Sequence, residues 1–381
     1  MAPRRRRTAR SLTVALLAAV LLPLSIAPGA TAATCASSTL AAMTRSQRIG
    51  QLFMYGLPNN SLTATDRAAI ASYHFGSVWF AKKTSIGVTA LRAVSDQIQA
   101  QATASATRQV RFLIAANQEG GLVQALNGPG FDTIPSALTQ GTWTPTYLRI
   151  KAGRWGSQLR AAGVNLDFAP VADVVPPGFD SQNAPIGQLD REFGHYPTPV
   201  AGRVAAFIGG MRDAGVGTTA KHFPGLGRVT ANTDYSSGVT DRVTTRYDSY
   251  LQPFARAVTM GVPFIMVSLA TYERIDPDHL AAFSPTIMRD MLRGDLDFQG
   301  VVMSDSLSAT AVSSISPGTR AIRFIAAGGD MIVLNPLDQA IAMHKAILAR
   351  MQVSTWFLAR VNDAALRVLR AKEKAGLLPC S

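Results

Sequence analysis

Polar side chains with chemical potential recur directly after short apolar runs of the sequence. They are carboxylates, amides and one lysine–histidine pair, the groups that enzymes use to transfer protons, attack carbon or bind hydroxyls. Any one of them could instead cap a helix or solvate a turn, but several in equivalent positions favour a shared site. The candidates are Asn117, Gln118, Glu119, Asp167, Asp173, Lys221, His222 and Asp305.

Eight apolar, β-branched runs that could position these residues as strands lie along the chain, and helix-like stretches fill most intervals between them. Several of the predicted helices end at a glycine, as at Gly163, Gly215 and Gly261. The predicted strands are 51–56, 76–80, 111–117, 165–170, 218–223, 264–269, 300–305 and 330–334. The predicted helices are 89–104, 148–162, 198–214, 248–260, 285–292, 319–327, 337–351 and 357–376.

This alternation predicts an α/β protein with a single (β/α)8 TIM barrel, because near-continuous apolar strands separated by helices are typical of a closed parallel sheet. A doubly wound open sheet is the alternative, but no GxGxxG follows the first predicted strand. In a barrel, catalytic groups lie at the C-terminal ends of the strands. The candidate residues would then share one rim.

The first 32 residues have the pattern of a secretion signal. Five arginines precede an uncharged apolar stretch over 11–26, and Ala30-Thr31-Ala32 resembles a signal-peptidase site. We therefore expect a signal peptide over 1–32, one barrel domain over 33–381, and a secreted, extracellular enzyme without stable membrane insertion. A basic surface would also favour association of the secreted protein with the cell wall.

The two cysteines, Cys35 and Cys380, lie at opposite ends of the predicted mature chain. An even pair in an exported protein predicts a disulfide, and the alternative is two free thiols. The five histidines show no close metal-ligand spacing, so we expect neither a metal nor a cofactor. No basic tract with interleaved aromatics occurs, which argues against a nucleic-acid partner. A monomer is expected.

Five segments of the chain resemble glycoside hydrolase family 3, within it the bacterial β-N-acetylglucosaminidase branch. The resemblance covers about residues 40–376, and the segments occur in the family's order. They are LIAANQEGGLVQ at 113–124, GVNLDFAPVADV at 163–174, KHFPGLGR at 221–228, DPDHLAAFSPTIMRDML at 276–292 and GVVMSDSL at 300–307.

The resemblance implies retaining glycoside hydrolysis, in which one carboxylate attacks the anomeric carbon and a second group protonates the leaving oxygen and then activates water. Asp305, in GVVMSD, matches the family nucleophile. Lys221 and His222 match the pair that binds sugar hydroxyls. Arg191, in the longer segment IGQLDREFG, matches a substrate-holding arginine, with a surface salt bridge as the alternative.

Two departures from the family pattern bear on substrate binding. Asn117 replaces an aspartate that binds a sugar hydroxyl, and a neutral amide binds a hydroxyl less strongly than a carboxylate does. A different sugar in this subsite is therefore an open alternative. Leu226 replaces a histidine, which is expected to affect substrate shape more than chemistry.

The third departure bears on proton transfer. The branch carries an acid/base histidine in a D-S-H triplet, whereas this chain reads Asn232-Thr233-Asp234. In one interpretation Asp234 is the acid/base, supported by Asn232; in the other, the chain binds glycans with little or no turnover. The predicted function is exo-acting hydrolysis of terminal β-linked N-acetylglucosamine. The alternatives are a β-glucosidase or other β-hexosidase of the family, and a weak or inactive wall-glycan-binding protein.

Overall fold

The computed structural model describes residues 1–3, 8, 9, 11 and 34–380. Thr34–Ser381 forms one compact unit. The predicted signal peptide over 1–32 falls almost wholly outside the described residues, and both it and the domain boundary stay predictions. Among the described residues, no helix combines the length and apolarity needed to cross a membrane.

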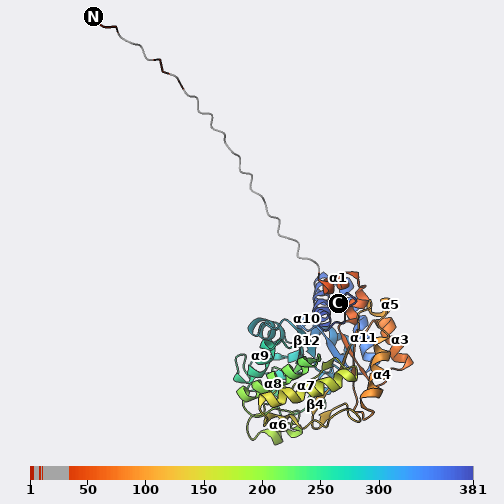
Figure 1. Ribbon diagram of the computed structural model, residues 1–381. Coiled ribbons are helices and arrows are strands. Elements are labelled where there is room, and N and C mark those ends of the chain that lie inside the picture. Colours follow the sequence, from red (N-terminus) through yellow and green to blue (C-terminus); the bar gives the residue numbers. More distant parts are fainter. Residues whose placement is uncertain (4–7, 10, 12–33, 381) are drawn as a thin grey trace. The chain divides into compact units, whose positions relative to one another are not determined.

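Eight parallel strands form a barrel, which confirms the predicted single (β/α)8 fold (Figure 1). The sheet order is β12-β9-β7-β6-β3-β2-β1-β13, and a parallel bridge between Met303 and Met331 joins its two ends. Each strand falls within or overlaps a predicted run. The barrel strands are β1 (Phe53–Leu57), β2 (Ser77–Phe80), β3 (Leu113–Ala116), β6 (Leu166–Asp167), β7 (Gly217–Phe223), β9 (Phe264–Val267), β12 (Val301–Ser304) and β13 (Ile332–Leu334).

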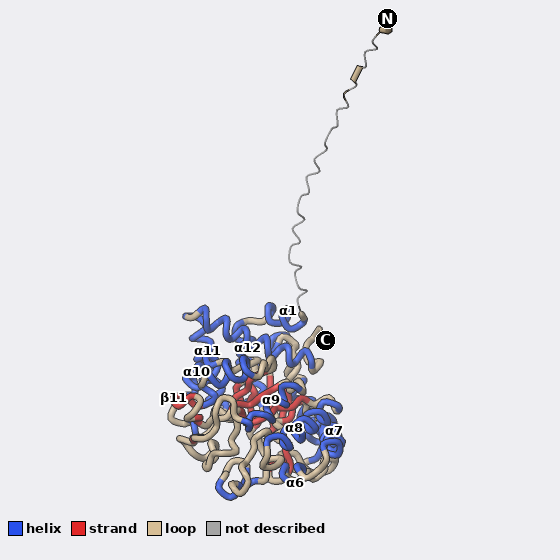
Figure 2. The backbone as a smooth tube through the Cα atoms, turned by 90° about the vertical axis from the view of Figure 1, so that its left-hand side faces the viewer, coloured by secondary structure: helices blue, strands red, loops and turns tan. Residues whose placement is uncertain are grey.

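Helices surround the strands (Figure 2). They are α1 (Cys35–Ala42), α2 (Arg45–Gly50), α3 (Ala64–Tyr73), α4 (Gly87–Gln99), α5 (Ala104–Thr107), α6 (Ala137–Gly141), α7 (Pro145–Ala161), α8 (Pro197–Asp213), α9 (Gln252–Thr259), α10 (Pro317–Ala327), α11 (Leu337–Val353) and α12 (Thr355–Lys374). Short strands on the loops are β4 (Gln118–Gly120), β5 (Val123–Gln124), β8 (Thr240–Asp241), β10 (Thr271–Tyr272) and β11 (Asp276–Leu280).

Several helical segments differ from the sequence predictions, and the short helices α1, α2, α5 and α6 were not predicted. The segment predicted over 285–292 is a π-helix at Thr286–Asp295. Helix α3 was not predicted, and its start is a capping box: Thr63 accepts a hydrogen bond from the backbone of Asp66, whose side chain accepts one from the backbone of Thr63. The buried Tyr55 hydroxyl also donates to Asp66 at 2.8 Å, so this cap is joined to β1.

Apolar side chains fill the inside of the barrel and close one of its ends. Strand residues such as Met54, Leu166 and Met303 form an interior cluster, which Val368 of α12 and Leu377 join. Helix α12 packs with α1 and lies at the end of the barrel where the C-terminus is found, whereas loops dominate the opposite end (Figure 2). The site is therefore confined to the loop-rich C-terminal rim.

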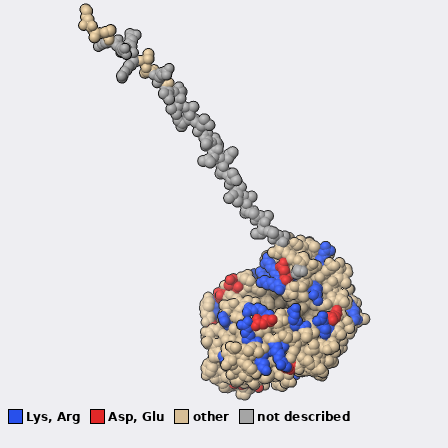
Figure 3. All heavy atoms as spheres, in the orientation of Figure 1, with Lys and Arg blue, Asp and Glu red and all other residues tan. Residues whose placement is uncertain are grey.

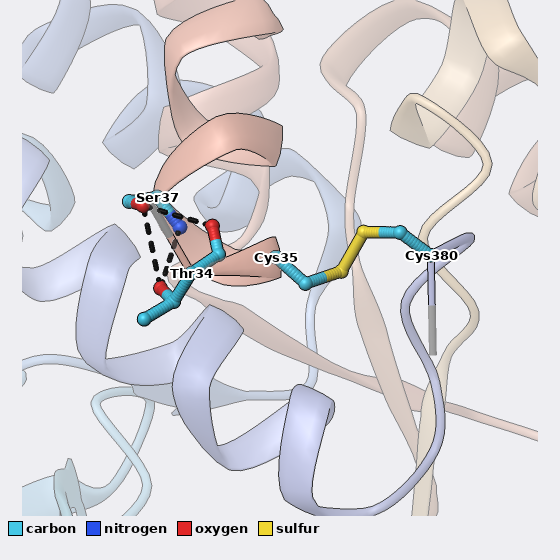
Figure 4. The surroundings of a disulfide bond; sticks show 4 residues. All are labelled: Thr34, Cys35, Ser37 and Cys380. Carbon is cyan, nitrogen blue, oxygen red and sulfur yellow. Dashed lines mark hydrogen bonds between the residues drawn. A yellow bond between two sulfur atoms is a disulfide. The ribbon is translucent and has the colours of Figure 1, made fainter. Parts of the chain in front are cut away.

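Cys35 and Cys380 form a disulfide with a Cα–Cα distance of 6.0 Å, as predicted (Figure 4). Next to it, the Thr34 side chain caps α1 by accepting a hydrogen bond from the Ser37 backbone nitrogen at 3.3 Å. On the face seen in Figure 3, lysine and arginine side chains are scattered between areas of uncharged surface, with a few acidic side chains beside them.

Candidate active site

The structure brings the rim residues together from four of the eight barrel strands. Asn117 follows β3, Asp167 ends β6, Lys221 and His222 lie near the end of β7, and Asp305 comes directly after β12. Parallel strands present their carboxyl ends on one side of a barrel, so these residues converge although they span almost 190 positions of sequence. The Arg191 segment follows β6, and the Asp234 loop follows β7.

A buried ion-pair cluster lies at the centre of this rim. Arg191 donates to both carboxylate oxygens of Glu119, from Nε at 2.9 Å and from Nη2 at 2.8 Å. Lys221 Nζ lies 2.5 Å from Glu119 Oε1. The Arg191 side chain is only 13% exposed, so the surface salt bridge considered for it from the sequence is wrong: the pair is buried in the site.

Glu119 stays ionised in this cluster. Burial disfavours its charged form, but the adjacent Arg191 and Lys221 outweigh burial and lower the pKa of Glu119 to about 2. Lys221 Nζ also donates to Asn117 Oδ1 at 2.8 Å. Because Asn117 is neutral, Glu119 is the carboxylate that balances Lys221 at this end of the barrel.

His222 is oriented by a second buried carboxylate. Its Nδ1 lies 2.7 Å from Asp173 Oδ2, and the other oxygen of Asp173 accepts the backbone nitrogens of His222 and Leu226 at 3.1 and 2.8 Å. An ionised carboxylate only accepts hydrogen bonds, so Nδ1 carries the proton and Nε2 is the nitrogen available to a ligand. The Leu226 side chain is itself buried, and its backbone supports Asp173.

Asp305 and Asp234 lie on two different loops. The backbones of these loops form hydrogen bonds with each other. The backbone nitrogens of Thr310 and Ala311, shortly after Asp305, donate to the carbonyls of Asp234 and Thr233 at 3.3 and 3.1 Å. Asn232 Oδ1 accepts the Asp234 backbone nitrogen at 2.9 Å. Asn232 thus supports Asp234 through the backbone of the loop and not through the Asp234 carboxyl group.

The electrostatics of Asp234 differ from those of an isolated aspartate. Its side chain keeps access to solvent, yet the protein atoms around the carboxyl partly desolvate it. This desolvation and then the negative charge of Asp305 raise the pKa of Asp234, while His222, Arg191 and Lys221 act in the opposite direction. A carboxyl with a raised pKa beside a carboxylate is the arrangement expected of a proton donor and its partner.

Glu119, Asp167 and Asp173 were nominated from the sequence by position alone, without a role. Asp167 accepts the Gln118 backbone nitrogen at 3.0 Å, and burial raises its pKa to about 7. The sequence signal for these three residues was their position just after predicted strands. Their pairings with Arg191, Lys221 and His222 required the folded chain, because the partners are tens of residues apart.

Carboxyl groups and buried cations on the C-terminal rim of a (β/α)8 barrel define an enzyme site of the barrel type. A family model described as "Glycosyl hydrolase family 3 N terminal domain" matches residues 44–371. The chain is 30% identical over 330 residues to a β-hexosaminidase of Nitrosomonas eutropha, covering 84% of this chain and 89% of that protein. The chain therefore belongs to glycosyl hydrolase family 3.

Solved structures show the same relationship. The β-N-acetylhexosaminidase of Beutenbergia cavernae superposes with a TM-score of 0.84 at 48% identity, covering 87% of this chain and 99% of that one. A family 3 β-N-acetylglucosaminidase of Paenibacillus gives a TM-score of 0.78 at 26% identity, covering 88% of this chain and 63% of that one. The protein is a glycoside hydrolase that acts on O-glycosyl bonds, and its substrate is a carbohydrate.

Proposed function

We propose that the protein is a secreted, retaining exo-β-glycosidase that releases terminal β-linked N-acetylglucosamine. The observation that carries this proposal is the backbone contact of the Asp234 loop with the segment after Asp305, where desolvation and the charge of Asp305 raise the pKa of Asp234. The names of the related β-hexosaminidases support the choice of sugar. The basic sequence and the predicted signal peptide support export to a wall-rich environment.

In the proposed reaction, the Asp305 carboxylate attacks the anomeric carbon while protonated Asp234 gives its proton to the leaving oxygen. A covalent glycosyl–Asp305 ester forms and the aglycone departs. Asp234, now ionised, takes a proton from water, which attacks the anomeric carbon and releases Asp305. Both carboxyl groups return to their starting state, so one water is consumed per bond cleaved.

The remaining rim residues bind and orient the sugar in this proposal. His222 offers Nε2 because Asp173 holds its Nδ1. Lys221 and Arg191 present N–H groups that are held in place by Glu119. Asn117 can accept from one hydroxyl and donate to another, without the charge that strengthens such bonds.

The assignment is tested with chromogenic β-N-acetylglucosaminide and β-glucoside substrates. We expect the wild type to prefer the N-acetylglucosaminide and Asp305→Ala to fall to background. Asp234→Ala should lose about 10²–10⁴-fold, with azide restoring turnover by attacking the glycosyl–enzyme. Asp278→Ala, at an exposed carboxylate, is the control and should keep full activity. Wild-type activity no higher than that of Asp305→Ala would show a glycan-binding protein instead, and preference for the glucoside would identify a β-glucosidase.

Product analysis in phosphate buffer tests the role of Asp234 further. An ionised Asp234 repels an incoming phosphate, so free sugar should be the main product with or without phosphate. A glycosyl phosphate as the main product would contradict an anionic base at this position. The same assay on culture medium and on cells would test export.

A further inference from the structure

Three potential metal-ligating side chains meet beside the active site, on the segment between β6 and α8. They are Asp180, Glu192 and His195, and each offers one ligand atom within 4.8 Å of the other two. Asp180 begins a 3₁₀ turn at Asp180–Gln182. None of the three takes part in the proposed glycosidase chemistry.

Glu192 is the member that needs a partner. Its residue is fully buried, and neither of its carboxylate oxygens accepts a hydrogen bond of normal geometry. Asp180 Oδ1 also accepts no hydrogen bond of normal geometry. A buried carboxylate without a donor is costly, so it must hold a proton or face a cation.

His195 completes a mixed nitrogen and oxygen ligand set. Its Nδ1 lies 3.5 Å from Asp180 Oδ1 and 3.2 Å from the Val175 carbonyl. The side chain is 30% exposed, which leaves a path for an ion from solvent. One imidazole and two carboxylates suit Zn²⁺, which often takes three protein ligands and a water, better than Ca²⁺, which takes six to eight oxygens.

We propose that Asp180, Glu192 and His195 form a binding site for a divalent transition-metal ion, with Zn²⁺ as the ion of best-matched chemistry. The ion would supply the positive charge that the Glu192 carboxylate lacks. Because Glu192 directly follows Arg191, a bound ion would also hold the segment that carries the arginine of the Glu119 cluster. The site is structural, and no catalytic step passes through it.

The sequence alone predicts no metal site, since 180, 192 and 195 do not follow a known ligand spacing. Folding of the segment that contains Arg191 brings the three together. The proposal is independent of the sugar specificity and of the role of Asp234.

The test is equilibrium dialysis of the full chain, stripped with chelator, against Zn²⁺, with metal analysis and thermal unfolding as readouts. We expect one Zn²⁺ per chain and a higher Tm with Zn²⁺ than without it. Glu192→Gln and the more exposed His195→Gln should each weaken Zn²⁺ binding at least ~10²-fold, because even outer-shell partners are worth ~10–100-fold. Asp190→Asn is the matched control, since it removes an exposed acid two residues from Glu192 and should retain the ion.

The catalytic carboxyls provide a second control, because they could also attract Zn²⁺. The Asp234→Asn/Asp305→Asn variant should still bind one ion. Binding that disappears in this variant and survives Glu192→Gln would overturn the proposal. So would a preference for Ca²⁺ over Zn²⁺, or no Zn²⁺ bound, the result expected if Asp180 and Glu192 share a proton instead.

Discussion

Three carboxyl groups on the rim receive different roles from their neighbours. Arg191 and Lys221 both pair with Glu119 and keep it ionised. Glu119 in turn holds these two cationic side chains in place. Desolvation and then the negative charge of Asp305 raise the pKa of Asp234. Environments that push the pKa values of neighbouring carboxyls apart are how a single site holds both an acid and a base.

Removing the charge of Asp305 should lower the pKa of Asp234. The variant Asp305→Asn removes one of the two causes that raise this pKa and keeps the shape of the side chain. The measurement is an NMR pH titration of the Asp234 carboxyl carbon in both proteins. In the wild type, kcat/KM should fall as the pH rises through the Asp234 pKa, because the proton donor is lost. An Asp234 pKa that is the same in both proteins would contradict the coupling.

Glu119→Gln should lower the free energy of unfolding by about 3–5 kcal/mol near neutral pH, because it leaves Arg191 and Lys221 buried without their carboxylate. Urea denaturation measures the loss. The control is Glu273→Gln, the same substitution in an exposed ion pair with Arg242. It should lower the free energy of unfolding by no more than about 1 kcal/mol.

The effect of Glu119→Gln should also depend on pH. The folded-state pKa of about 2 lies below the ordinary value of 4.5, so the ionised form stabilises the fold above pH 4.5. This stabilisation is lost as the pH falls from 4.5 through 2. The difference between wild type and variant should therefore shrink over that range, and a constant difference would contradict the low pKa.

At the scale of elements, α7 and α8 pack closely on the outside of the barrel. A Cβ atom at Gly210 of α8 would lie 2.7 Å from both the Ala152 Cβ and the Gly153 backbone nitrogen of α7, and closer still to the Arg149 carbonyl oxygen. Gly202, on the same helix, has no atom within 4 Å of such a Cβ. The glycine at 210 thus sets the distance between the two helices.

Gly210→Ala should lower the free energy of unfolding by about 1–3 kcal/mol, because a methyl group there forces the helices apart. Gly202→Ala should instead raise it by about 0.5–1 kcal/mol, since alanine favours the helix and meets no obstacle. Urea denaturation of the two variants separates packing from helix propensity. Equal effects at both positions would show that propensity alone matters.

At the scale of the whole molecule, stability and chemistry are placed at opposite ends of the barrel. Helix α12 and the Cys35–Cys380 disulfide lie at the closed end, and the Arg111 backbone nitrogen donates to the Leu377 carbonyl there at 2.8 Å. The carboxyl groups lie on the other rim. Changes at the closed end should therefore affect folding without altering the reaction.

Replacing both cysteines, Cys35→Ser with Cys380→Ser, should lower the free energy of unfolding by about 2–4 kcal/mol. The disulfide closes a sequence separation of 345, so its loss frees the unfolded chain substantially. Denaturation with and without reductant measures this effect, and reductant should matter only for the wild type. An unchanged kcat/KM in the variant is expected, and a large fall would show that the closed end influences the site.

Much of the fold was predictable because it depends on local pattern. Apolar runs such as 218–223 and 300–305 predicted β7 and β12, and the strand-end rule placed Lys221, His222 and Asp305 on one rim. Helix α3 was missed because its main signal in the sequence is the short capping box formed by Thr63 and Asp66. The π-helix at Thr286–Asp295 was missed because its apolar spacing resembles that of an α-helix.

The sequence by itself determined the barrel, its family and the positions of the carboxyl groups on the rim, since these follow from periodicity and from short motifs. Only the tertiary structure decided what surrounds each charge. Arg191 and Glu119 are 72 residues apart, and Asp173 and His222 are 49 apart. Coulomb interactions and desolvation depend on distances of a few ångströms between such residues, and those distances exist only once the chain has folded.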